Sequence, residues 1–344
     1  MESPIFTFAV LIVFSIIVYH IYFYAQELKL QRKGSDFDDC ILRGARLMTS
    51  GFSPYKEKSY LGNPCSPGPI VHMIHLPFIK LGIFQLATAF WLFVTTITLR
   101  VMERNWIFPN IFLLILCSSP IFWGISVIGC DYVTFSCILL LSVLSLKQCV
   151  IKQNHESIII TAVLCGIMAG TRVNFLYLPF AFAFALFFYH RKAIPMFLLI
   201  SCLIAFLPGA YFYFLDPNSF TPFHVLTRGH QALSPVPMII TLVINIALFI
   251  LGTCKFRKNV DNILLFFLFI VAPSLIFLSI GSLFWVKLNI IEWEGANYFV
   301  PIYPMLAAIY AKTILDDKFS LFGLEKTPEA AADPKLIRVK SMPA

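Results

Sequence analysis

The chain has 344 residues, of which 59% are hydrophobic and 13% charged, and its formal net charge is +8. A mean hydropathy of +0.82 with 36 Phe indicates a protein that is apolar outside as well as inside, which excludes a water-soluble globular fold and predicts a polytopic membrane protein. The basic tail is too slight to indicate nucleic-acid binding.

About ten apolar segments are predicted to be membrane-spanning helices. A crossing needs roughly 20 apolar residues, and a helix satisfies its own backbone hydrogen bonds in lipid. The segments cover residues 4–25, 84–99, 106–123, 132–146, 158–170, 175–189, 193–215, 236–252, 262–284 and 298–315. The predicted fold is an all-α polytopic bundle over residues 1–315, in which the first span is an uncleaved anchor. Because the segments between residues 158 and 189 are short and contain Arg172 and Pro179, we expect a broken or re-entrant pair there.

Lys and Arg predict the orientation, because they accumulate in short cytoplasmic loops. With a cytoplasmic N-terminus, the inner turns contain Arg100, Arg104, Lys147, Lys152, Arg191, Lys192, Lys255, Arg257 and Lys258. The short outer turns contain only Arg172, Arg228 and Lys287. Both termini are therefore predicted to be cytoplasmic, with residues 316–344 as a disordered tail. The membrane is a bacterial inner membrane or the endoplasmic reticulum, and topology follows the same rules in both.

Residues 26–83 form a large first outer loop that we expect to contain surface helices. Asp36, Asp38 and Asp39 precede a mixed apolar and basic stretch that predicts a short helix on the membrane surface. Acids at a helix start cap its exposed amides, but capping needs only one, so the cluster is either a cap or a catalytic site. Gly51 is predicted to end this helix, and residues 70–79 to form a second surface helix.

Cysteine and histidine give weaker signals. Cys40 and Cys65 both lie in the first outer loop, where an oxidising compartment would allow a disulfide, and the sequence leaves open whether they pair. His72 and His75 have no further ligand nearby, so a metal is not predicted.

The order of these motifs resembles the GT-C superfamily of polytopic glycosyltransferases, which take a sugar from a polyprenyl or dolichyl phosphate. The residues concerned are DFDD at 36–39, GFSPY at 51–55 and PCSPGP at 64–69, followed by the weaker GCDY at 129–132, GTRVNFLYLP at 170–179 and NYFVPIYP at 297–304. The last differs from the family's R-Y-x-x-P segment, because Asn297 stands where Arg is frequent. The pattern covers about 50 residues.

The resemblance implies a mannosyltransferase-like enzyme, inverting, that moves one sugar from a polyprenyl- or dolichyl-phosphate donor in the membrane lipid to an unknown glycan, lipid or protein acceptor on the non-cytoplasmic face. An acceptor hydroxyl needs a base and the leaving phosphate needs a cation. Asp38 or Asp39 is the implied base, with Asp36 as the third candidate. No cofactor or metal is expected, since members using simple lipid-phosphate sugars commonly work without one.

Arg172 is the first candidate cation, with an internal salt bridge to Asp131 as the alternative. The implied substrate-binding residues are Tyr55, Arg172, Asn174, Arg228, Lys287, Asn297 and Tyr298. A transporter or lipid flippase is a rival interpretation, although the two halves of the chain show no internal repeat. A catalytically silent GT-C relative is a second rival, which the missing Arg at Asn297 leaves open.

Overall fold

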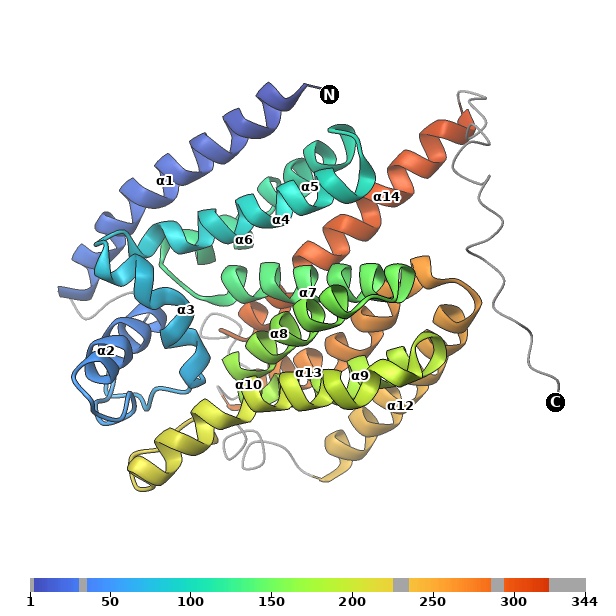
Figure 1. The fold of residues 1–344 in the computed structure, drawn as a ribbon. Coiled ribbons are helices and arrows are strands. Elements are labelled where there is room, and N and C mark those ends of the chain that lie inside the picture. Colours follow the sequence, from blue (N-terminus) through green and yellow to red (C-terminus); the bar gives the residue numbers. More distant parts are fainter. Residues whose placement is uncertain (1–2, 31–35, 225–234, 286–293, 322–344) are drawn as a thin grey trace.

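The computed structural model describes residues 3–30, 36–224, 235–285 and 294–321, and these parts are helical without any strand (Figure 1). The N-terminal half contains α1 (Pro4–Leu30), α2 (Phe37–Thr49), α3 (Pro69–Lys80), α4 (Ala87–Glu103), α5 (Ile107–Cys117), α6 (Pro120–Val127) and α7 (Tyr132–Lys152). The C-terminal half contains α8 (His155–Thr171), α9 (Leu178–Tyr189), α10 (Ile194–Leu215), α12 (Pro235–Lys258), α13 (Ile263–Trp285) and α14 (Tyr303–Leu321). Short 3₁₀ turns, among them η1 (Phe84–Leu86), η2 (Val173–Phe175), η3 (Arg191–Ala193), η4 (Val260–Asn262) and η5 (Glu294–Ile302), join several of them.

The prediction of an all-helical membrane bundle is confirmed, but the number of ten spans is wrong. Within the described residues, 6 helices are long and apolar enough to cross a membrane, or 7 if a bent pair counts as one span. Helices α8 and α9 are too short for this, and α5 and α6 are bent by 80° at their junction. A new helix, α6, starts at Pro120 with Ser119 as its N-cap. Proline has no backbone N–H to donate to the preceding turn, so it is favoured at the first position of a helix and does not continue α5. Segment 106–123 is therefore two helices.

Two other predicted features agree with the structure. The chain breaks at Arg172, which is extended (φ −146°, ψ 143°) between α8 and η2, as expected for the broken pair. Residues 70–79 lie in the 12-residue helix α3, which is too short to span. The disordered tail was predicted to begin at residue 316, but α14 continues to Leu321, so residues 316–321 are helical. Residues 322–344 lie outside the described part.

Helix α7 forms the centre of the core. Its side chains are almost all buried, and it packs against α4, α8 and η5. In contrast, α1 and α10 leave many large apolar side chains exposed, among them Ile5, Leu199 and Phe214. Exposed apolar helix faces around an apolar core are what a lipid environment requires.

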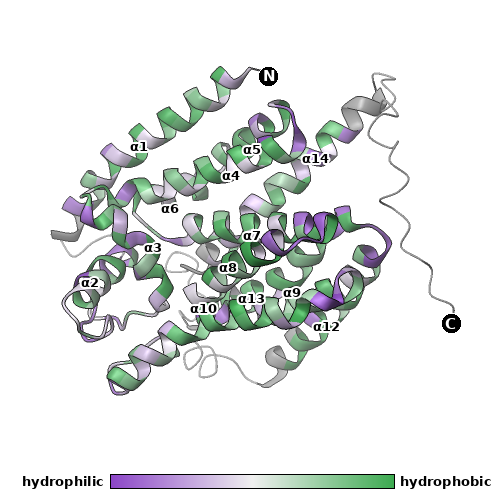
Figure 2. Ribbon diagram, in the orientation of Figure 1, coloured by the Kyte–Doolittle hydropathy of each residue, from purple (hydrophilic) through white to green (hydrophobic). Residues whose placement is uncertain are grey.

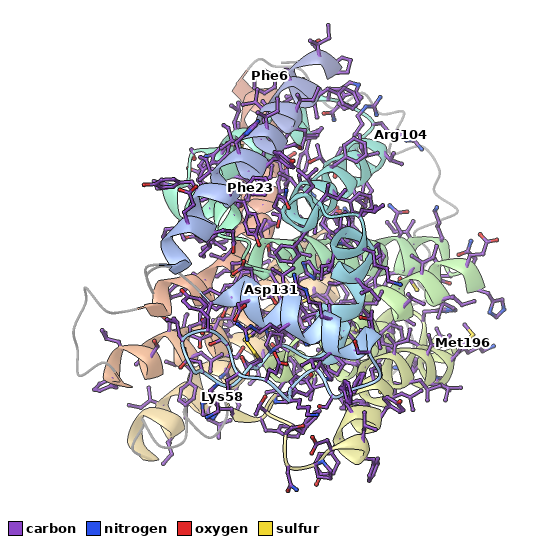
Figure 3. The ribbon with its side chains drawn as sticks, turned by 90° about the vertical axis from the view of Figure 1, so that its left-hand side faces the viewer. Phe6, Phe23, Lys58, Arg104, Asp131 and Met196 are labelled. Carbon is purple, nitrogen blue, oxygen red and sulfur yellow. A yellow bond between two sulfur atoms is a disulfide. The ribbon has the colours of Figure 1, made fainter. Side chains whose placement is uncertain are left out.

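Polar residues gather at the two ends of the bundle, with apolar helix surface between them (Figure 2). One end bears α2 and α3, and Figure 3 looks onto it, with Asp131 labelled near its centre. The other end bears the last turns of α7 and α12 and the 3₁₀ turn η3 after α9, which are rich in Lys and Arg. Lys147 and Lys312 both pair with Asp261 there, at 2.6 and 3.7 Å.

Candidate functional site

The three acids lie at the start of α2, but their carboxylates do not cap it. Asp36 occupies the N-cap position without a side-chain capping bond, and Asp38 and Asp39 lie in the first turn. Gly51 follows the end of the helix with φ of +79°, a conformation that favours glycine, so the predicted helix end is confirmed. Since the caps make no use of the carboxylates, other contacts explain their positions.

Asp38 points into the bundle. Its side chain is fully buried, and Oδ2 accepts hydrogen bonds from the Tyr22 hydroxyl (2.7 Å) and from Nε2 of Gln26 (2.8 Å), both on α1. Gly129, before α7, has φ of +72°, and a Cβ there would lie 3.1 Å from the Cβ of Asp38. Only glycine therefore allows the turn before α7 to approach Asp38 so closely.

Asp36 and Asp39 instead hold the loop that follows α2. Asp36 accepts bonds from Ser59 (2.6 Å) and Asn63 (3.0 Å). Asp39 accepts one from the backbone N–H of Tyr60 (2.8 Å) and pairs with Arg43 (2.8 Å). The hydrogen bond that Arg43 donates to Asp39 raises the pKa of Arg43 above its ordinary value. Both acids are only partly buried, and their contacts show a structural role in this loop.

Cys40 and Cys65 form a disulfide, which settles the pairing that the sequence left open. The bond joins the first turn of α2 to the Pro-rich turn 64–69, with 5.4 Å between the two Cα atoms. The carbonyl of Cys65 also accepts a hydrogen bond from Thr221, beyond α10. The acidic helix is thus fixed to the Pro-rich turn and to the end of α10.

Arg172 forms the internal ion pair that was the alternative to phosphate binding. Its Nη2 donates to both oxygens of Asp131, at 2.8 and 2.9 Å, and Nη1 donates to Ser66 in the Pro-rich turn (3.2 Å). The guanidinium also lies 5.3 Å from the ring centroid of Tyr132. Arg172 is 9% exposed, so this pair joins the start of α7, the end of α8 and the Pro-rich turn in the interior.

Backbone contacts bring the same turn against the end of α8. The N–H of Gly68 donates to the carbonyl of Thr171 (2.7 Å). A Cβ on Gly68 would lie 2.1 Å from the carbonyl oxygen of Gly170, and a Cβ on Gly170 would lie 2.5 Å from Ile70. The glycines of the PCSPGP and GTR segments therefore permit two backbones to meet.

Tyr55 and His72 are both buried, and their ring centroids lie 6.0 Å apart. The Tyr55 hydroxyl donates to the carbonyl of Pro67 (3.0 Å), and burial raises the pKa of that hydroxyl well above its ordinary value. His72 fits against Gly44, where a Cβ would lie 2.3 Å from the imidazole ring. Burial lowers the pKa of His72 to about 4, and it also lowers the pKa of His75. No group of metal-ligating side chains occurs among the described residues.

The remaining predicted residues are only partly placed. Tyr298 lies in η5 with its ring centroid 6.2 Å from that of Tyr132, which brings it next to the Arg172 contacts. Asn174 follows Arg172 in η2 and makes no side-chain hydrogen bond within the described part. Arg228 and Lys287 lie outside the described residues, as does the side chain of Asn297.

Tyr22 and Gln26 are the site residues that sequence reasoning missed. They are four residues apart near the end of the first span, so both lie on one helix face. Polar and aromatic residues are common at a span's end as membrane-interface anchors, which hid their contact with Asp38. A tyrosine and a glutamine four residues apart, shortly before the acidic cluster that contains Asp38, form the pattern that could have identified them.

No family model, curated protein or solved structure matches this chain. The resemblance to GT-C enzymes therefore stays a prediction, and the geometry above is the ground on which function is argued.

Proposed function

We propose that this chain is a membrane glycosyltransferase of the GT-C type, in which Asp38 is the general base. The observation that supports the proposal most strongly is the environment of Asp38: a fully buried carboxylate at the α2 end of the bundle, whose hydrogen-bond donors include Tyr22 and Gln26 of α1. A carboxylate at such a position is the type of group that can accept the proton of an acceptor hydroxyl in glycosyl transfer. It would take that proton from the acceptor hydroxyl as the sugar leaves its lipid phosphate.

Asp36 and Asp39 are positioning residues in this proposal. Both are engaged with loop 56–63, and Asp39 is already paired with Arg43. Gln26 is only partly buried, so its bond to Asp38 is the one that an incoming acceptor hydroxyl would replace.

Arg172 takes a different role from the one first assigned to it. Because both Nη atoms already have partners, we assign it to holding the Pro-rich turn. Arg228 and Lys287, which the resemblance implied to be substrate-binding residues, are then the proposed cations for the departing lipid phosphate.

A catalytically silent relative is the second candidate. The full burial of Asp38 favours it, because a base must be reached by its substrate. A sugar-transfer assay distinguishes the active enzyme from the silent relative.

The test is sugar transfer by the purified full chain in lipid nanodiscs. Radiolabelled polyprenyl-phosphate mannose, glucose and galactose are offered with a membrane extract as the source of acceptors. We expect one donor to be used, and Asp38→Asn to reduce turnover by about 10²–10⁴-fold, the usual effect of losing a general base. Asp261→Asn, at the opposite end of the bundle, is the charge-matched control. Equal turnover in Asp38→Asn would remove Asp38 as the base, and no turnover with any donor would favour the silent relative.

A further inference from the structure

The basic end of the bundle contains a compact group of cations drawn from three separate turns. Gln153, after α7, donates to the carbonyl of Tyr189 at the end of α9 (3.4 Å), and the Tyr189 hydroxyl donates to the carbonyl of Phe256 in α12 (2.6 Å). These bonds bring the C-terminal ends of α7, α9 and α12 together. The cationic patch so formed consists of Lys152, Arg191, Lys192, Lys255, Arg257 and Lys258, all exposed.

The patch has a large excess of positive charge. None of its six cations makes an ion pair within the described residues. Asp261 lies nearby but is held by Lys147 at 2.6 Å and Lys312 at 3.7 Å. Glu156, in the first turn of α8, is the acid closest in sequence to Lys152. The charge is therefore available to an external anion.

Apolar side chains place these cations at the level of lipid headgroups. Ile151, Phe187 and Leu251 are 43%, 43% and 53% exposed, and each lies within about one helical turn of a patch cation. The Arg191 guanidinium lies over the Phe187 ring at 4.2 Å. Lys and Arg next to lipid-facing apolar side chains lie at the boundary between hydrocarbon and headgroups. There the aliphatic part of the side chain stays in hydrocarbon and its charged group reaches the headgroup region.

We propose that the cationic patch is a binding site for the phosphate headgroup of an anionic phospholipid in the adjoining leaflet. Several Lys and Arg next to a membrane-spanning helix attract anionic lipid, and each contributes about fivefold in affinity. The aromatic rings beneath Arg191 and Arg257 hold their guanidinium planes in place (4.2 and 5.3 Å). The proposal is independent of the chemistry at Asp38.

The test is native mass spectrometry of the purified full chain in neutral detergent, titrated with phosphatidylglycerol or with phosphatidylcholine of the same acyl chains. We expect preferential binding of phosphatidylglycerol, and a loss of about 25-fold in the Arg257→Gln/Lys258→Gln variant. Arg191→Gln/Lys192→Gln provides an independent second variant. Lys56→Gln/Lys58→Gln, on the loop at the opposite end, removes the same charge and serves as the matched control.

Two results would overturn the proposal. Equal weakening in the control variant would mean that net charge, and not the patch, attracts the lipid. Displacement of phosphatidylglycerol by soluble glycerol phosphate at an equal concentration would assign the patch to a soluble anion. Thermal unfolding of each variant in the same detergent verifies that folding is unchanged.

Discussion

Asp38 differs from Asp36 and Asp39 in what holds its carboxylate. Its donors include a tyrosine and a glutamine on the apolar helix α1, whereas the other two acids accept hydrogen bonds from the loop that follows α2. The sequence predicted the acidic cluster but could not rank its members, because residues only one to three positions apart all fit a catalytic or a capping role. The distinction depends on the direction of each side chain around the first turn of α2.

Replacing Tyr22 with Phe tests the bond from α1 to Asp38. The change leaves a buried carboxylate with one donor fewer, and a hydrogen bond to a charged group contributes about 1.5–3 kcal/mol. We expect a lower melting temperature in nanodiscs and reduced transfer activity. Tyr24→Phe is the matched control on the same helix, since Tyr24 is 64% exposed. Equal effects of the two substitutions would show that the hydroxyl of Tyr22 does not hold Asp38.

His72 makes the stability of the α2–α3 end of the bundle depend on pH. Its pKa is about 4 in the fold, against 6.5 for the free side chain, so below pH 6.5 the unfolded chain binds a proton that the folded chain does not. The stability that the neutral His72 side chain gives the fold is fully present above pH 6.5. It is lost as the pH falls to about 4, which lowers the free energy of unfolding by about 3 kcal/mol in total. Denaturant unfolding at pH 7 and pH 4 measures it.

The comparison needs two histidine variants. His72→Gln is expected to show a smaller loss of stability between pH 7 and pH 4 than the wild type. His155→Gln, at an exposed position, is expected to show the wild-type loss. An unchanged loss in His72→Gln would contradict the assignment to this residue.

Among the elements, the break between α8 and α9 has the clearest structural purpose. It places Arg172 where it binds Asp131 on α7 and Ser66 in the Pro-rich turn, and the Cys40–Cys65 disulfide extends this connection to α2. Arg172 and Pro179 allowed the break to be predicted. The 80° bend between α5 and α6 was missed, because the apolar residues on both sides of Ser119 and Pro120 read as one continuous span.

A double-mutant cycle tests the Asp131–Arg172 pair. Asp131→Leu alone leaves a buried guanidinium without its carboxylate, and Arg172→Met alone leaves a buried carboxylate without its guanidinium. Each single change is expected to cost about 3–5 kcal/mol. The double variant Asp131→Leu/Arg172→Met removes both charges and is expected to be more stable than either single variant, as followed by thermal unfolding. Additive losses in the double variant would show that the two residues act separately.

At the scale of the whole molecule, charge divides the protein into two ends. The disulfide and the acids lie at one end and most of the basic turns at the other. Disulfides persist in oxidising compartments, and basic turns stay in the cytoplasm. The sequence predicted this division from the Lys and Arg of its short turns, whereas the first loop, which also carries Arg43, Arg46, Lys56 and Lys58, departs from the bias. The sequence overcounted the spans, because hydropathy identifies apolar segments but not how long a straight helix each one forms.

The polarity predicts a definite topology. One additional cysteine, Lys58→Cys or His155→Cys, is introduced into a background in which the exposed Cys254 is replaced by Ser and the buried and partly buried cysteines are kept. With intact cells or sealed vesicles of known orientation, we expect an impermeant maleimide to label position 58 only from the non-cytoplasmic side. Position 155 should react only from the cytoplasmic side. Labelling of both positions from one side would contradict the assignment.

The most direct test of Asp38 as the base compares three variants in one single-turnover assay. Release of polyprenyl phosphate is measured for Asp36→Asn, Asp38→Asn and Asp39→Asn, with the donor that the wild type uses and with each variant's melting temperature recorded. We expect Asp38→Asn to lower the rate by about 10²-fold or more while substrate still binds. The other two should lose activity only in proportion to the stability that they lose. A wild-type rate in Asp38→Asn, or an equal loss of rate in all three at unchanged stability, would contradict the assignment of Asp38.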